Sequence, residues 1–288
     1  LVESDIYLKA KGENESLKLY GQEPHKTGWR LCNLALPING KFDSVIETGD
    51  ALTMPAFVEN NCLTHFDRVV TVPPFSKKNW GYEIVKNDAF GRFRYGVPPK
   101  GTGDFAYLQH SIATLNEHGK LVTVAPAGMM FRGGAEGSIR KGIVRSDLIE
   151  AIIALPPGIF AHTSIPTYII VINMEKSADR ENSVLFIAAD KKFHNDKRTT
   201  SLEEEDVAKV ISSYKEYSDI EKYCRVVNVS EIAENDFNLS MSLYVDTSPE
   251  IETVDIDNAL NRIIKIESRR EIIRSELSKA LETLRNFD

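Results

Sequence analysis

The chain has 288 residues, of which 42% are hydrophobic and 27% charged, a composition that predicts a globular protein with a large core. No stretch approaches the roughly 20 apolar residues that a membrane-spanning helix needs, and residues 1–5 do not resemble a secretory signal. The net charge of −7 argues against a protein that binds nucleic-acid phosphates unaided, because counterion release by Lys and Arg drives such binding. A subunit that depends on a partner for most of that affinity remains compatible with this charge.

The three cysteines, Cys32, Cys62 and Cys224, lie far apart. Their spacing predicts neither a disulfide framework nor a zinc site, so we expect a cytoplasmic protein with buried, reduced thiols. The six histidines are scattered, and no metal site is predicted.

Short apolar runs alternate with helical patterns along most of the chain. Residues 1–4 have the character of a helix, and the helix predicted next is stopped by Pro37 and Gly40. We therefore expect an α/β fold with a parallel-type sheet and helices on both faces. The predicted strands are 17–23, 44–50, 66–72, 120–125, 149–155, 167–172, 184–189 and 224–229, and the predicted helices are 25–36, 104–117, 137–146, 202–217 and 256–284.

The helix predicted at 256–284 is long and highly charged. Its apolar residues are spaced by three and four positions, with a break around 267–270. That spacing is typical of a coiled-coil seam for a partner helix, and a helix packed on its own domain would show it as well. The apolar positions are 256, 260, 263, 273, 277, 280 and 284.

Acidic residues close the first two predicted strands. A carboxylate at Glu23 could accept hydrogen bonds from both hydroxyls of a ribose, and one at Asp50 could accept a hydrogen bond from an adenine amine. Ligands of open α/β sheets bind at the carboxyl ends of the strands, so the pair indicates a nucleoside site. Nicotinamide dinucleotides and S-adenosylmethionine both satisfy this pattern, and acids in solvated turns are the alternative.

A glycine-rich turn, which lets the backbone approach such a cofactor, does not precede Glu23. The glycine clusters at 100–104 and 132–137 come too late in the chain to serve. We expect the chain to begin just downstream of that turn.

The third strand runs into Val72, Pro73, Pro74 and Phe75. This segment resembles the catalytic motif of amino-methyltransferases, in which Asn or Asp is followed by Pro-Pro and Phe or Tyr. Two acceptors, the first side chain and the next backbone carbonyl, hold the hydrogens of a weakly nucleophilic amine, and the aromatic ring stacks on a flipped base. Val72 has no acceptor, so we expect severely impaired methyl transfer. An ordinary Pro-Pro-Phe loop is the alternative.

Motifs along nearly the whole chain resemble the modification subunits of type I restriction–modification enzymes. They are 20–23, 29–36, 75–81, 91–100, 103–110, 131–137, 139–142, 147–156, 236–239 and 244–246. The resemblance implies an incomplete Rossmann-like class I methyltransferase sheet over 1–200, a small α/β extension over 201–250 and a C-terminal assembly helix over 251–288. It also implies S-adenosylmethionine as cofactor, adenine N6 in double-stranded DNA as acceptor, and specificity and restriction subunits as partners.

By this resemblance, Glu23 and Asp50 would hold the cofactor, and Val72, Pro73, Pro74 and Phe75 would form the catalytic loop. A basic–aromatic loop offers Arg92, Arg94 and Lys100 as candidates for DNA contact, with a solvated loop as the alternative.

Three other functions stay open. The chain could be an inactive methyltransferase fold retained for assembly with a specificity subunit, which Val72 and the absent glycine turn favour. A methyltransferase acting on protein glutamine or RNA is disfavoured by the segment 76–110 and the terminal helix. A nicotinamide dehydrogenase lacks its glycine fingerprint.

Overall fold

The computed structural model describes residues 2–12, 17–160, 163–190, 194–196, 199–248 and 256–285. The chain forms two compact units, 1–247 and 248–288. Within the first unit, β12 (Cys224–Asn228) pairs with β9 (Ser183–Ala188), so the segment after residue 200 extends the same sheet. The finer division at residue 200 remains a prediction.

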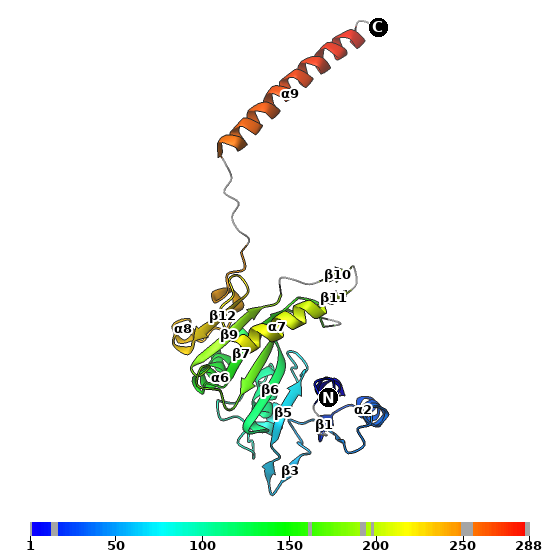
Figure 1. Ribbon diagram of the computed structural model, residues 1–288, viewed down its shortest axis with the longest axis vertical. Coiled ribbons are helices and arrows are strands. Elements are labelled where there is room, and N and C mark those ends of the chain that lie inside the picture. The colour runs from blue at the N-terminus through cyan, green and yellow to red at the C-terminus, as the bar shows by residue number, and fades with distance from the viewer. Residues whose placement is uncertain are drawn as a thin grey trace. The chain divides into compact units, whose positions relative to one another are not determined.

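A six-stranded sheet with the order β12-β9-β7-β8-β6-β5 forms the centre of the first unit (Figure 1). It is mixed, whereas the sequence predicted a parallel-type sheet. β8 runs antiparallel to both of its neighbours, and β12 runs antiparallel to β9, while β5–β6 and β7–β9 are parallel. The described residues between β7 and β8 (156–160 and 163–166) form no crossover helix, and parallel neighbours require such a crossover. The other strands are β5 (Phe66–Thr71), β6 (Leu115–Pro126), β7 (Ile149–Leu155) and β8 (Thr167–Asn173).

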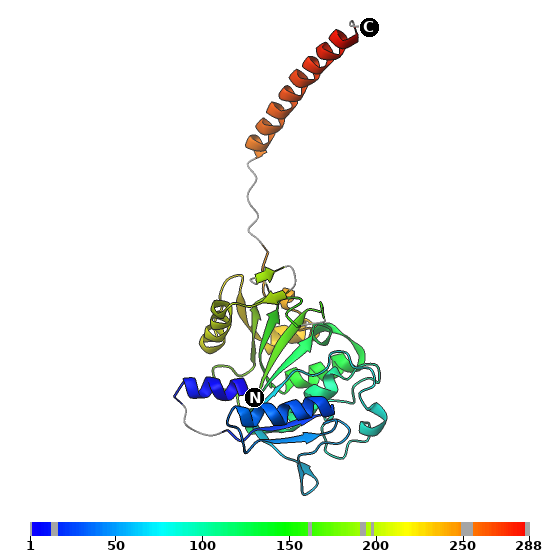
Figure 2. The same cartoon turned by 90° about the vertical axis from the view of Figure 1, so that its right-hand side faces the viewer.

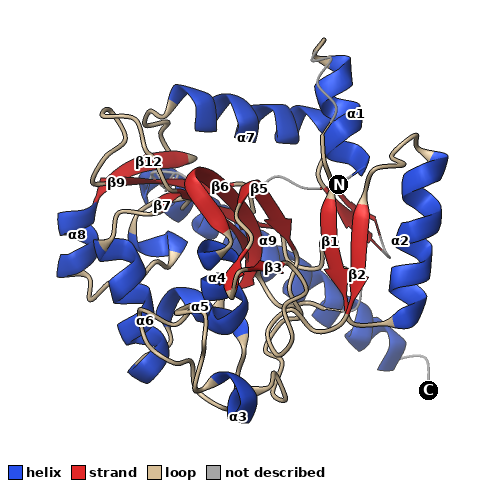
Figure 3. Cartoon of the chain, turned by 90° about the horizontal axis from the view of Figure 1, so that it is seen from below, coloured by secondary structure: helices blue, strands red, loops and turns tan. Residues whose placement is uncertain are grey.

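Side chains of β7 alternate between two apolar layers, as strand geometry requires. Ile152 and Ala154 join the main core, which packs beneath α4 (Asp104–Ala113), α5 (Gly128–Phe131), α6 (Gly134–Arg145) and α8 (Val229–Glu234). Ala151 and Ile153 join a second core, covered by α7 (Glu204–Glu216). Figure 3 shows α7 on one face of the sheet and the other four helices on the opposite face.

A separate parallel pair, β1 (Tyr20–Glu23) and β2 (Val45–Thr48), carries the two acidic strand ends. Helix α2 (Lys26–Ile38) lies along this pair (Figure 2) and packs Trp29 and Leu36 against it. The Tyr20 ring lies 5.3 Å from that of Phe66, which joins the pair to the start of β5.

The remaining elements differ modestly from the prediction. α4 ends at Ala113 rather than 117, because β6 begins at Leu115, and α2 continues through Pro37. Short elements are α1 (Val2–Ala10), α3 (Tyr82–Val85), the hairpin of β3 (Val58–Glu59) and β4 (Cys62–Leu63), the hairpin of β10 (His194–Asp196) and β11 (Thr199–Ser201), and the 3-10 turn η1 (Met241–Leu243).

The second unit contains α9 (Ile256–Arg285), a 30-residue helix. Apolar side chains along it, among them Leu260, Ile263 and Leu277, are half or more exposed. Neither α9 nor any other helix in the described ranges is long and apolar enough to cross a bilayer.

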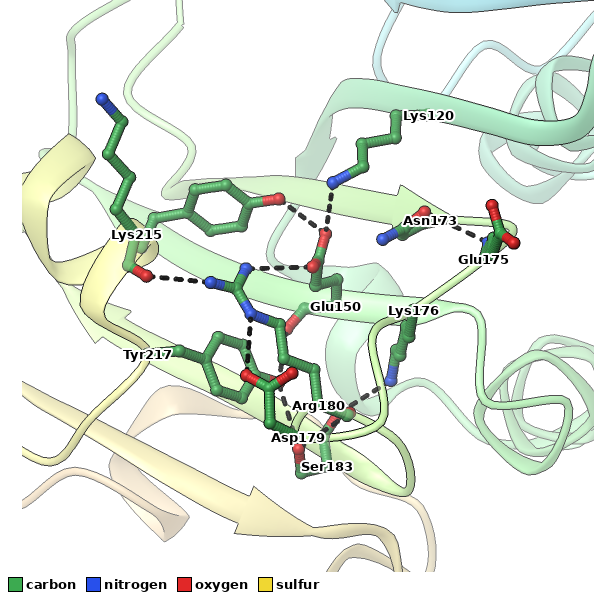
Figure 4. Close-up of polar contacts among 11 residues, drawn as sticks. Lys120, Glu150, Asn173, Glu175, Lys176, Asp179, Arg180, Ser183, Lys215 and Tyr217 are labelled. Atoms are coloured by element: carbon green, nitrogen blue, oxygen red, sulfur yellow. Dashed lines mark hydrogen bonds and ion pairs between the residues drawn. The ribbon is translucent and has the colours of Figure 1, made fainter.

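A buried carboxylate, Glu150, anchors α7 to the sheet (Figure 4). A β-bulge at this position of β7 turns Glu150 away from the main core. Its oxygens accept hydrogen bonds from the Tyr214 hydroxyl (2.6 Å), Arg180 Nη1 (3.1 Å) and Lys120 Nζ (3.5 Å). Burial would raise the pKa of Glu150, but these partners hold it below its ordinary 4.5.

Tyr214→Phe removes one charge-assisted hydrogen bond from this carboxylate, and we expect it to lower the free energy of unfolding by about 2 kcal/mol. The pKa of Glu150 is lowered by folding, so its contribution is complete above pH 4.5 and is lost as the pH falls through the folded-state value. The deficit of the variant should therefore shrink in acid. Urea denaturation across this range measures it.

Lys215→Met is the matched control, because only the backbone carbonyl of Lys215 takes part, accepting from Arg180 Nη2. Its unfolding free energy should stay within about 0.5 kcal/mol of the parent. An equal loss in both variants would contradict a specific role for the Tyr214 hydroxyl.

Candidate active site

Glu23 and Asp50 lie at the same end of the β1–β2 pair. Glu23 pairs with Thr48 in the parallel register, and Asp50 follows two residues later. The Glu23 carboxylate accepts a hydrogen bond from the backbone N–H of His25 (2.9 Å) at the start of α2. A Cβ at Gly28 would lie 2.8 Å from Cδ of Glu23, so glycine there leaves room for the carboxylate. The structure thus brings both predicted acids to one edge.

Asp50 organises the turn that follows β2. Its Oδ1 accepts from the backbone N–H groups of Leu52 (2.9 Å) and Thr53 (3.4 Å), an Asx-type turn. Its Oδ2 lies 3.2 Å from Nζ of Lys77, which also lies 3.2 Å from the Tyr107 hydroxyl. Burial alone would lower the pKa of Lys77, but its hydrogen bonds to Tyr107 and Asp50 raise it, so the amine stays charged.

The Pro-Pro-Phe loop follows β5. Val72 is 58% exposed and presents an apolar side chain at the strand end. The ring of Phe75 meets that of Phe160, from the loop after β7, edge to face at 5.9 Å between centroids. Two aromatic rings from distant segments therefore adjoin this loop.

Ser76 has a positive φ of 51°, a conformation that non-glycine residues adopt at a cost. The backbone N–H of Ser76 donates to Oδ1 of Asp104 at 2.6 Å, and the N–H of Gly103 donates to the carbonyl of Lys77 at 3.0 Å. The N-terminus of α4 therefore holds the loop in this conformation.

Arg132 supports the same residue of α4. Its Nη1 contacts the carboxylates of Asp104 (3.2 Å) and Glu136 (3.3 Å), both nearly buried. Burial raises the pKa of Glu136, although the nearby Arg132 charge opposes the shift. The loop, α4 and α6 are thereby joined by one charged cluster.

Arg92, expected to face DNA, is instead buried. Its side chain is 2% exposed and is paired with Asp88, with Nη2 2.7 Å from Oδ1. Nη1 donates to the carbonyl of Ala51 (3.4 Å) and to Nδ1 of His110 (3.2 Å), since a guanidinium cannot accept. Burial, reinforced by the Arg92 charge, lowers the pKa of His110 to about 4, which leaves its imidazole neutral. A contact between Arg92 and DNA is thus not supported by its position.

Arg94 and Lys100 lie at the surface of the same segment. Arg94 stacks on the ring of Tyr95, 4.8 Å from its centroid, and Lys100 forms an exposed ion pair with Glu83 at 2.8 Å. Both keep their charge accessible from solvent.

The carboxylates present fit the nucleoside half of S-adenosylmethionine. Glu23 and Asp50 supply acceptors at one sheet edge, although Oδ2 of Asp50 already has Lys77 as a partner. For a metal ion the donor set is different: within the described ranges, no group of three or more His, Cys, Asp or Glu side chains is placed to hold one.

Sequence reasoning missed Lys77, Tyr107, Asp104 and Phe160. A signal for two of them was available, because Asp104 and Tyr107 lie three residues apart on a predicted helix and so share a face. The Asp88 and Arg92 spacing of four likewise offered an ion pair. Phe160 had no such signal, since its proximity to Phe75 depends on the order of β5 and β7 in the sheet.

We expect Arg92→Met to lower the free energy of unfolding by about 3–5 kcal/mol, because it leaves the buried Asp88 carboxylate without its counter-charge. Arg94→Met, at an exposed arginine two residues away, should change it by less than about 0.5 kcal/mol. Guanidinium denaturation followed by circular dichroism compares the two. If both substitutions change the free energy of unfolding by the same small amount, Arg92 is not a buried ion-pair residue and the expected contact with DNA becomes possible again.

Residues 1–253 match the family model described as N-6 DNA Methylase. The methylase subunit of the MjaVII type I restriction enzyme from Methanocaldococcus jannaschii is 33% identical, over 96% of this chain and 49% of the relative. The HindI methylase subunit from Haemophilus influenzae is 30% identical, over 98% of this chain and 63% of the relative. The chain thus spans about half to two thirds of the length of these relatives.

Solved structures agree with this fold. The methyltransferase subunit of a type I restriction–modification system from Streptococcus thermophilus superposes with a TM-score of 0.74 at 31% identity, over 84% of this chain and 52% of that one. The EcoKI M protein gives 0.66 at 16% identity, over 96% and 66%, a likeness of fold alone. The expected Rossmann-like methyltransferase fold is confirmed, and the chain belongs to the N-6 DNA methylase family, in which the relatives it matches are methylase subunits of type I restriction enzymes.

Proposed function

We propose that this chain provides the modification subunit, or a large part of it, of a type I restriction–modification system. The family reaction is methyl transfer to adenine N6 in DNA. The proposal rests on the proximity of the candidate cofactor acids to the Pro-Pro-Phe loop. Lys77, two residues after Phe75 on that loop, places its Nζ 3.2 Å from Oδ2 of Asp50.

Glu23 and Asp50 would hold the ribose and adenine of S-adenosylmethionine, which supplies an electrophilic methyl group. Glu23 offers its carboxylate to two hydroxyl donors, while Asp50 offers an oxygen to an amine. The turn that Asp50 organises with Leu52 and Thr53 keeps this carboxylate in place.

Phe75 would stack on a flipped adenine, and Phe160 would supply the second aromatic wall beside it. The carbonyl of Pro73 would accept one hydrogen of the adenine amine. Val72 offers no acceptor for the other, so the amine nitrogen gains less nucleophilic character. This missing acceptor is the observation that favours a second candidate function, an inactive methyltransferase fold that serves assembly with a specificity subunit.

The partners would be the specificity and restriction subunits, and α9 would serve assembly with them. The substrate would be double-stranded DNA. Apolar side chains exposed on an otherwise charged helix support a seam for another helix. Arg94 and Lys100, which are accessible, remain the candidates for contact with the DNA backbone.

Val72→Asn should raise the methylation rate by about 10²-fold or more, as expected for restoring one hydrogen bond that strengthens in the transition state. The measurement is tritiated methyl transfer to DNA by the full-length subunit assembled with its specificity subunit. Val70→Asn is the matched control, because Val70 is equally exposed, at 58%, and should rescue nothing. Equal rates with Val72 and Asn at this position would contradict impairment, and inactivity of both would favour the assembly function.

Ile263→Asp combined with Leu277→Asp should abolish co-purification with the specificity subunit, because the two residues lie on one side of α9 and would place charges in the seam. Ile272→Asp, on the opposite side and 60% exposed, should retain it. If all of these variants associate normally, α9 is not the assembly helix.

A further inference from the structure

One side of α4 contacts two loops of the candidate site, at Ser76–Lys77 and at Arg92, and reaches a third, at Ala51, through Arg92. Asp104, Tyr107 and His110 are spaced by three residues and therefore share this side. Asp104 binds the backbone of Ser76, Tyr107 binds the side chain of Lys77, and His110 binds Arg92, which reaches the carbonyl of Ala51. The helix thus holds the Pro-Pro-Phe loop and the Asp50 turn at a fixed separation.

These contacts fix the backbone of Lys77, whereas its side-chain ammonium has two hydrogen-bond acceptors within reach. The carbonyl of Lys77 accepts from Gly103, and Nζ lies 3.2 Å from both Asp50 Oδ2 and the Tyr107 hydroxyl. Lys77 is 34% exposed and Asp50 is 26% exposed, so neither charge is fully solvated. An ammonium in such a place is stabilised by keeping at least one protein acceptor.

We propose that Lys77 is a competitor for Asp50 that must yield when a nucleoside binds, and that Tyr107 is the acceptor that retains it afterwards. This inference rests on the proposed cofactor site. The adenine amine and the Lys77 ammonium both need Oδ2, because Oδ1 is engaged by the amides of Leu52 and Thr53. Since Lys77 follows Phe75 by two residues, release of its side chain links occupancy of the cofactor site to the Pro-Pro-Phe loop.

Two substitutions are expected to act in opposite directions. Lys77→Met removes the competitor and should tighten binding about 2- to 5-fold, the factor that a part-exposed ion pair contributes. Tyr107→Phe removes the acceptor that retains the displaced ammonium, so it should weaken binding by about the same 2- to 5-fold factor. The double variant should match Lys77→Met, because no ammonium is left for Tyr107 to hold. A merely structural role would make both single variants weaker.

The test is isothermal titration calorimetry of S-adenosylhomocysteine with the full-length subunit. Lys77→Arg keeps a cation at this place and should bind like the parent, and Lys78→Met, at the exposed neighbouring lysine, should be unchanged. Melting temperatures check that each variant is folded.

If the parent binds S-adenosylhomocysteine but the two substitutions do not change its affinity in opposite directions, the proposed competition is wrong and the cofactor site is still supported. Absence of binding in the parent together with binding in Lys77→Met would be its strongest support. Absence of binding in both would overturn the competition and the proposed cofactor site together.

Discussion

Helix α4 lies between the apolar interior and the loops of the candidate site, and the site depends on how it is held. Phe105, Leu108 and Ile112 bury one side of the helix in the main core. The opposite side meets the polar groups of the loops, so burial of the first side sets the position of the second. Because protein interiors are close-packed, a shift of this helix would disturb the core and the site at once.

The charged contacts around α4 differ in how much water reaches them. Arg92 and Asp88 are almost wholly enclosed, whereas Lys77 and Asp50 retain about a third and a quarter of their exposure. An enclosed ion pair stays together, because separating its charges in a poorly solvated place is costly. A part-exposed pair with a second acceptor can exchange partners. The same helix therefore supports both a rigid and an adjustable contact.

The acids at strand ends and the Pro-Pro-Phe loop could be predicted from the sequence, because each follows from local rules for where strands stop. Glu23, Asp50 and Phe75 needed only a strand and its end. Arg92 was misread because basic and aromatic neighbours suggest a surface, while its enclosure depends on Asp88 and on packing that one segment does not contain. The antiparallel β8 and the Phe75–Phe160 contact likewise depend on the order of strands, which alternation of helices and strands does not determine.

The bulge at Glu150 sets the phase of the strand that follows it. The extra residue interrupts the alternation of side chains, so Glu150 and Ala151 both lie on the α7 side while Ile149 and Ile152 face the main core. A relative lacking that residue would keep regular alternation along the strand but would lose one of the two side chains that face α7. Length changes in this part of the chain should therefore be accepted in the loops on either side of β7 and rejected within it, which makes the bulge a marker for aligning distant members of the family.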